Sequence, residues 1–121
     1  MIKGIKIVSI PVRSQDAAIA FYTEKLGFRV HTDQPFNDNQ RWIELSIPGA
    51  DTLIALFTPD GHENRIGGFY PATFWCDNVQ KTYDDLLARG VEFLGPPQQQ
   101  SWGTFALFKD QDGNQFVLSS R

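Results

Sequence analysis

Residues 7–30, IVSIPVRSQDAAIAFYTEKLGFRV, decide the fold. Apolar and β-branched residues up to Val12 alternate with polar ones, which predicts a strand with both faces covered. Ser14 is placed to cap a helix, Gly27 to end it in a left-handed turn, and Phe28 to begin a second strand. The buried stripe of this helix is expected to consist of Ala18, Phe21, Tyr22 and Leu26.

A similar arrangement returns in residues 74–94, FWCDNVQKTYDDLLARGVEFL. Asp77 or Asn78 is expected to cap the second helix, and Gly90 falls where Gly27 falls in the first copy. The repetition predicts an α+β fold made of two βαβββ modules, whose curved mixed sheets surround a cup-shaped cavity. We expect one domain over 1–121, with modules at 1–59 and 69–121 and a linker at 60–68.

The remaining elements follow from alternation and turn chemistry. Residues 33–39 and 95–103 are rich in turn formers and are expected to be loops, and Gln98, Gln99 and Gln100 are most simply a solvated part of the second. Further strands are expected at 28–32, 41–47 and 53–58 in the first half, and at 70–76, 91–94, 104–109 and 115–119 in the second.

Composition narrows the classes of function. The chain has 121 residues and a net charge of −3, with 41% hydrophobic and 21% charged residues. The charge argues against nucleic acid as the main partner. Apolar runs fall short of the roughly 20 residues that cross a bilayer, and the N-terminal segment is β-patterned and not a signal peptide. Cys76 is the single cysteine, which fits the reducing cytoplasm, so we expect a cytoplasmic protein without a membrane partner.

Two motifs carry a family resemblance. Phe21-Tyr22 precedes Leu26-Gly27-Phe28, and the segment 109–116 reads KDQDGNQF. With the paired modules, these motifs resemble the vicinal oxygen chelate superfamily, which includes glyoxalase I, extradiol dioxygenases, fosfomycin-resistance enzymes and bleomycin-resistance proteins. The second motif is similar to that family's D-P-D-G-N hairpin, with Gln111 for the proline. One fold in this family serves several chemistries, so the resemblance does not name the reaction.

The resemblance also implies where a metal ion would bind. Enzymes of this family typically hold one divalent ion with His and Glu side chains from four strands. Counting from the shared motifs puts the four positions at Ile7, Leu56, Pro71 and Val117. These side chains have no donor atom, and neither His nor a carboxylate occupies a neighbouring position. We therefore predict no metal and no cofactor.

Three other polar residues are candidate ligands for a metal ion. His31 follows an expected strand and precedes a polar loop, which favours a solvent-exposed ring over a ligand. His62 and Glu63 lie in the polar linker, where an ordinary surface loop is the simpler interpretation.

Glu44 is the candidate for catalysis. If the hairpin pairs about Gly49 to Asp51, Glu44 faces Leu56 and points into the cup beside Trp42. Burial there would raise the pKa of its carboxyl group unless a cation such as Arg41 pairs with it. Glu44 is thus a candidate base or ligand anchor, and an ion pair at the rim is the alternative.

Aromatic residues could form a stacking surface for a flat ligand. Alternation places Trp75 on the cup face and Phe74 and Cys76 toward the helix, with Cys76 an inert buried thiol. Plain core packing or a dimer interface is the alternative for each aromatic residue. The predicted ligand-binding residues are Ser9, Arg41, Trp42, Glu44, Trp75, Trp102, Phe105 and Gln115.

Three functional hypotheses remain open. The first is a metal-free module that binds a small apolar or aromatic molecule, since the resemblance implies drug-binding proteins that are homodimers sharing their cups. The second is a lyase, isomerase or dioxygenase-like enzyme that acts on a small oxygenated substrate through Glu44 or a non-standard metal site. The third is a structural or partner-binding role with the cup filled by side chains.

Overall fold

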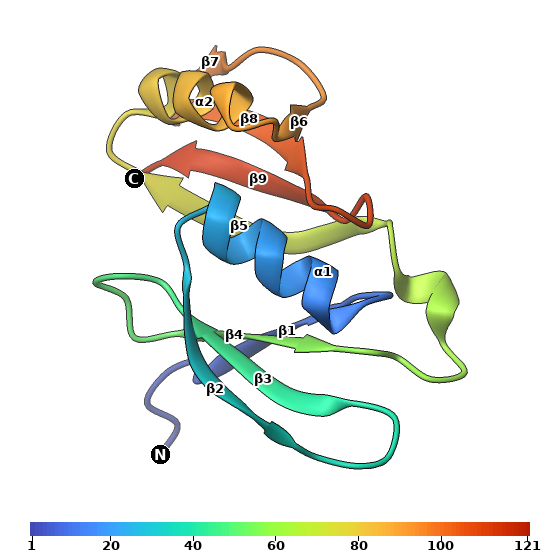
Figure 1. Cartoon of the computed structure of the whole chain (residues 1–121). Helices are drawn as coiled ribbons and strands as arrows, with labels where there is room; N and C mark the ends of the chain where they lie inside the picture. Colours follow the sequence, from blue (N-terminus) through green and yellow to red (C-terminus); the bar gives the residue numbers. More distant parts are fainter. The chain divides into compact units, whose positions relative to one another are not determined.

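Two compact units, Met1–Ile66 and Gly67–Arg121, make up the chain in its computed structural model, and each has one sheet and one main helix (Figure 1). The structure describes residues 1–70 and 72–121, so the position compared above with a metal ligand at Pro71 lies outside the described residues. The α+β class with two curved mixed sheets is confirmed. The module boundaries and the cup stay predictions.

The first unit has a four-stranded sheet in the order β1-β4-β3-β2. β1 pairs with β4 in parallel, and the other neighbours are antiparallel. Its elements are β1 (Ile7–Pro11), α1 (Gln15–Ala20), the π-helical turn η1 (Phe21–Lys25), β2 (Arg29–Pro35), β3 (Arg41–Ser46), β4 (Leu53–Phe57) and the 3₁₀ turn η2 (Glu63–Arg65).

The ends of α1 follow the sequence prediction. Ser14 Oγ accepts a hydrogen bond from the Ala17 N–H at 3.2 Å, and Gly27 has a φ of 80° after η1. Both devices satisfy backbone groups that a helix end leaves unpaired. The buried core of this unit consists mainly of Ile10, Val12, Ala18, Phe21, Tyr22, Ile43, Leu45, Ile54 and Leu56.

The second unit repeats the plan with the order β5-β9-β8-β6, and β7 pairs with β8 outside this path. Asn78 is the residue that caps its helix, because its Oδ1 accepts from the Lys81 N–H at 3.0 Å, and Gly90 has a φ of 90°. The elements are β5 (Phe69–Cys76), α2 (Val79–Ala88), β6 (Glu92–Phe93), β7 (Gln98–Gln100), β8 (Gly103–Lys109) and β9 (Gln115–Ser120).

A cluster of phenylalanine rings fills the core between α2 and its sheet. Phe108 lies 5.6 Å from Phe116 and 5.8 Å from Phe93, measured between ring centroids. The hairpin between β8 and β9 is closed by Asp110, which accepts from the backbone N–H groups of Asp112 and Asn114 and from the Asn114 side chain. The DQDGN motif therefore forms the hairpin that its sequence predicts.

Two expected loops contain strands. β2 continues to Pro35, where a loop was expected from Asp33, and Gln98–Gln100 is the edge strand β7 and not a solvated loop. Edge strands of this kind are exposed and do not need the apolar alternation that reveals a buried strand.

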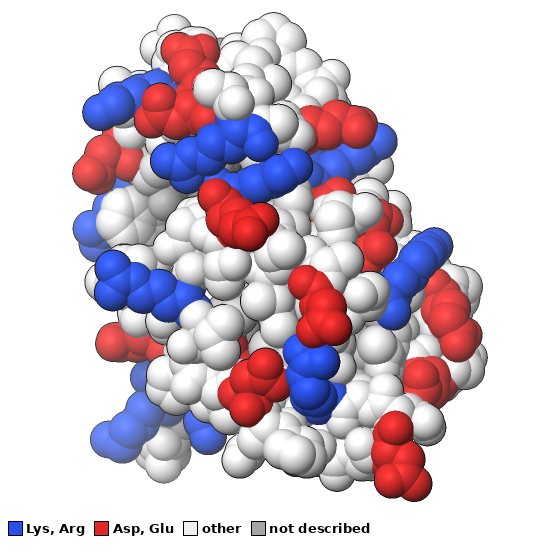
Figure 2. All heavy atoms as spheres, in the orientation of Figure 1, with Lys and Arg blue, Asp and Glu red and all other residues white. Residues whose placement is uncertain are grey.

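Figure 2 shows acidic and basic side chains interspersed over the visible face of each unit. Within the described part of the chain, every helix is too short or too polar to cross a membrane.

Candidate functional site

β3 and β4 separate toward one end of the first sheet, and two glutamine side chains bridge the gap. The strands pair only between Glu44–Ser46 and Leu53–Ala55. Beyond them, Gln15 Nε2 donates to the carbonyl oxygens of Arg41 at 2.8 Å and Leu56 at 2.9 Å, and its Oε1 accepts from the Arg41 N–H at 3.0 Å. The Gln40 side chain bonds both the N–H and the carbonyl of Thr58. Side-chain amides thus replace backbone ladder bonds here.

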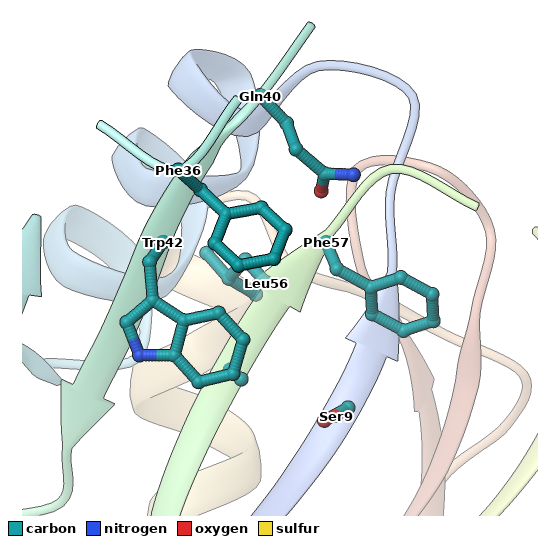
Figure 3. A pocket seen from close by; sticks show the side chains of 7 residues that line it. Ser9, Phe36, Gln40, Trp42, Leu56 and Phe57 are labelled. Carbon is teal, nitrogen blue, oxygen red and sulfur yellow. The ribbon is translucent and has the colours of Figure 1, made fainter. Parts of the chain in front are cut away.

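A hollow of about 280 Å³ lies at this separation, on the face of the sheet opposite α1 (Figure 3). We call that face the open face of the first sheet. The rings of Phe36 and Trp42 lie side by side with centroids 5.9 Å apart, and Phe57 stands across from them. The residues that line the hollow are Ser9, Phe36, Gln40, Trp42, Ala55, Leu56 and Phe57.

Glu44 is on the open face, but its surroundings differ from the prediction. It pairs with Ala55 and not with Leu56, because the turn closes one residue earlier, where the Ala50 N–H donates to the Ile47 carbonyl at 2.9 Å. Only 12% of its side chain is exposed. The pKa of the Glu44 carboxyl group is lowered, mainly by a hydrogen bond from Thr32. Trp42 and His31 also lower this pKa, whereas burial of the carboxyl group raises it. The rise in pKa that was expected for Glu44 without a cationic partner therefore does not occur.

Arg41 is not the cation beside Glu44. Its guanidinium donates to Asp33 at 2.9 Å and to Asp16 at 2.8 Å, and these hydrogen bonds raise the pKa of Arg41. Since Asp16 belongs to the first turn of α1, the Arg41 side chain lies on the face of the sheet that α1 covers. The structure does not bring it to the hollow.

His31 is the ionisable neighbour of Glu44. Its Nδ1 lies 3.3 Å from Oε1 of Glu44, at an irregularity in the pairing of β2 and β3. The ring is 54% exposed, as the sequence predicts, and it lies within β2. A carboxylate with a lowered pKa is a weak proton acceptor at neutral pH, so the geometry suits Glu44 better as a fixed negative charge than as a base.

The positions compared with the family's metal ligands carry carbon side chains. Ile7 and Val117 lie on the open faces of their sheets, whereas the register turns Leu56 toward the helix and puts Ala55 and Phe57 on the open face. Among the described residues, His, Cys, Asp and Glu form no group of three or more that could hold a metal ion. His62 and Glu63 are exposed at η2, and the Gly61 N–H donates to Glu63.

The second unit places its predicted residues together on the face of its sheet opposite α2. Pairing puts Trp75 and Phe105 beside Ser119, and Gln115 lies on the same face. Trp102 stacks on Phe105 with ring centroids 5.5 Å apart, and the Arg121 guanidinium lies 4.9 Å from the Trp75 ring.

Phe74 and Cys76 were predicted to lie on the helix-covered face of β5, and the structure agrees with this prediction in part. Phe74 packs in the core against Phe108 and Phe116. Cys76 is half-buried, where full burial was expected.

Five residues of the hollow were not among the predicted ligand-binding residues: Phe36, Gln40, Ala55, Leu56 and Phe57. Phe36 is an aromatic residue in the polar segment DQPFNDN, and an aromatic side chain in such a segment is a local sign of a binding residue. Gln40 and Phe57 gave no such signal, because their positions depend on how β3 and β4 separate.

Comparison with known proteins now adds to this geometry. A model of the Glyoxalase/Bleomycin resistance protein/Dioxygenase superfamily matches residues 4–118. The chain belongs to this superfamily. The uncharacterized protein YetH of Bacillus subtilis is 38% identical to the chain over 98% of each chain.

Solved structures are also similar to the chain. A member from Sphaerobacter thermophilus has a TM-score of 0.90 and 32% identity, covering 99% of this chain and 98% of that one. TnmS3, described as an antibiotic binding protein from Streptomyces sp. CB03234, has a TM-score of 0.84 and 32% identity, covering 98% of this chain and 96% of that one.

Proposed function

We propose that this superfamily member binds a small apolar or aromatic molecule without transforming it, and that the hollow in the first unit is part of the site. The observation that carries the proposal is the set of three rings, Phe36, Trp42 and Phe57, around one hollow. Small-molecule sites are typically concave and apolar with a few polar groups. Ser9 and Gln40 supply polar groups at this one.

Other observations support the same proposal. TnmS3, with 32% identity over nearly the whole chain, is described as an antibiotic binding protein. Within the second unit, Trp75, Trp102, Phe105 and Gln115 are proposed as ligand contacts on the open face of its own sheet. We also propose a homodimer, which the resemblance to drug-binding family members implies, and a cytoplasmic location, which the single cysteine favours.

A calorimetric titration with a panel of planar aromatic compounds tests the proposed function. We expect at least one compound to bind, and Trp42→Ala to weaken its binding about tenfold because a large aromatic wall is removed. Trp42→Phe keeps a ring and should restore most of the affinity.

Leu87→Ala is the matched control, because Leu87 is an exposed apolar residue of α2 outside the proposed site. It should leave the dissociation constant unchanged. A panel without any binding, or a Trp42→Ala variant that binds as well as the wild type, would contradict the proposal.

The enzyme hypothesis has one observation in its favour, the contact between Glu44 and His31. A carboxylate beside an imidazole can orient a general base. Such a lyase, isomerase or dioxygenase-like enzyme would alter its substrate, so mass spectrometry of a bound compound after long incubation separates the two functions. Recovery of the unchanged compound supports binding alone.

A further inference from the structure

A carboxylate borders the aromatic hollow. Glu44 lies opposite Ala55 in the register of β3 and β4, and it follows Trp42 by two residues on the same face of β3. Both of these neighbours line the hollow. Trp42 also contributes to lowering the pKa of the Glu44 carboxyl group. A ligand that packs against Trp42 therefore comes next to a negative charge.

That negative charge is largely shielded from water. The Glu44 side chain is 12% exposed, and its lowered pKa keeps the carboxyl group ionised at neutral pH. Charge interactions at a site with less water are stronger than at an exposed site. His31, which contacts Glu44, is charged only when its ring is protonated.

The rings beside this carboxylate favour the same kind of ligand. Faces of aromatic rings attract cations, and tryptophan does so most strongly. Phe36 and Trp42 lie with an interplanar angle of 43°, so they present two ring surfaces at one end of the hollow (Figure 3).

A cation lies against the Phe57 ring, which lines the hollow across from Phe36 and Trp42. The Arg65 guanidinium carbon lies 5.8 Å from the centroid of the Phe57 ring. A second positive charge beside that ring would be repelled. The negative charge of Glu44 therefore lies beside Trp42, and the positive charge of Arg65 lies beside Phe57.

We propose that the hollow selects flat aromatic ligands that carry a positive charge, with the charged group at the end formed by Trp42 and Glu44. The uncharged or anionic part of the ligand then lies toward Phe57 and Arg65. This inference rests on the proposed binding function and names its ligand class.

Calorimetric titration with a matched pair of probes tests it, using 10-methylacridinium and acridine at a mildly alkaline pH where acridine is uncharged. The two have nearly the same shape and differ in charge. We expect methylacridinium to bind about tenfold more tightly. Glu44→Gln should bring the ratio of the two dissociation constants close to one, whereas the exposed control Glu24→Gln should preserve it.

Arg65→Gln provides a second measurement that does not depend on the folding of the Glu44 variant. Removing this cation should tighten methylacridinium binding about twofold to threefold, and an unchanged affinity would contradict the proposed orientation. Equal affinity of the wild type for both probes would overturn the cation preference and leave the binding function standing. Absence of binding for both probes, with the planar panel also negative, would overturn the binding function itself.

Discussion

At the scale of single residues, Glu44 shows how a strand position acquires a chemical role. Alternation in β3 places it on the open face, while Ile43 and Leu45 are buried in the core. Its neighbours then determine its charge, because hydrogen bonds from Thr32, Trp42 and His31 favour the ionised form. The result is a stable negative charge beside an aromatic wall.

This arrangement predicts a pH dependence of stability. The pKa of Glu44 is lower in the folded chain than its ordinary value of 4.5, so its stabilising effect is present above that value and is lost as the pH falls through the folded pKa. We expect Glu44→Gln to reduce the free energy of unfolding near neutral pH and to make it less sensitive to acid. Urea unfolding at a series of pH values measures both effects.

Glu24→Gln is the control for this comparison, since Glu24 is exposed on η1. Its stability should follow the wild-type curve. Parallel curves for the wild type and Glu44→Gln over the whole acid range would show that the carboxylate makes no such contribution.

At the scale of elements, the separation of β3 and β4 gives the first sheet its hollow. The Gln15 side chain from the first turn of α1 enters the gap and satisfies backbone groups on both strands. Since Gln15 is only 8% exposed, water cannot readily replace it. The helix thus helps to fix the spacing of the strands that carry Trp42 and Phe57.

Gln15→Ala should therefore destabilise the chain by about 1–3 kcal/mol, because it leaves buried backbone groups without partners. Gln80→Ala is the matched control: Gln80 is exposed on α2 and donates a hydrogen bond to Asp84, so a change within about 0.5 kcal/mol is expected. Urea unfolding compares the two. Equal stabilities of the two variants would mean that the Gln15 bridge contributes little.

The same elements show what a sequence can and cannot predict. Both main helices were predicted from local signals, the caps Ser14 and Asn78 and the glycines Gly27 and Gly90. β7 and the end of β2 were missed because exposed edge strands have polar sequences. The register of β3 and β4 was off by one residue because the turn closes at Ala50.

The hollow was predictable only in part for a related reason. Ser9 and Trp42 follow from alternation along β1 and β3, which is a local pattern. Gln15 acts on groups 26 and 41 residues away in the sequence, so no local pattern reveals its role. Phe36 depends on the path of the loop between β2 and β3.

At the scale of the whole molecule, the two halves repeat one plan, and the superfamily match extends over nearly all of it. In each half a helix covers one face of a sheet, and the open face carries aromatic residues, Trp42 and Phe57 in the first and Trp75 and Phe105 in the second. The repeated fold thus provides apolar surface in both halves where the family's enzymes place ligands for an ion.

This distribution of side chains predicts a protein that does not depend on a metal ion. Ile7 and Val117 on the open faces have no donor atoms, and Ala55 and Phe57 have none in β4. We expect elemental analysis of protein purified without chelator to find no stoichiometric divalent ion, because carbon side chains do not coordinate hard or borderline cations. Treatment with EDTA should leave the affinity for the planar aromatic probes unchanged. A divalent ion bound one to one, whose removal abolishes probe binding, would overturn the assignment of these positions and favour the enzyme hypothesis.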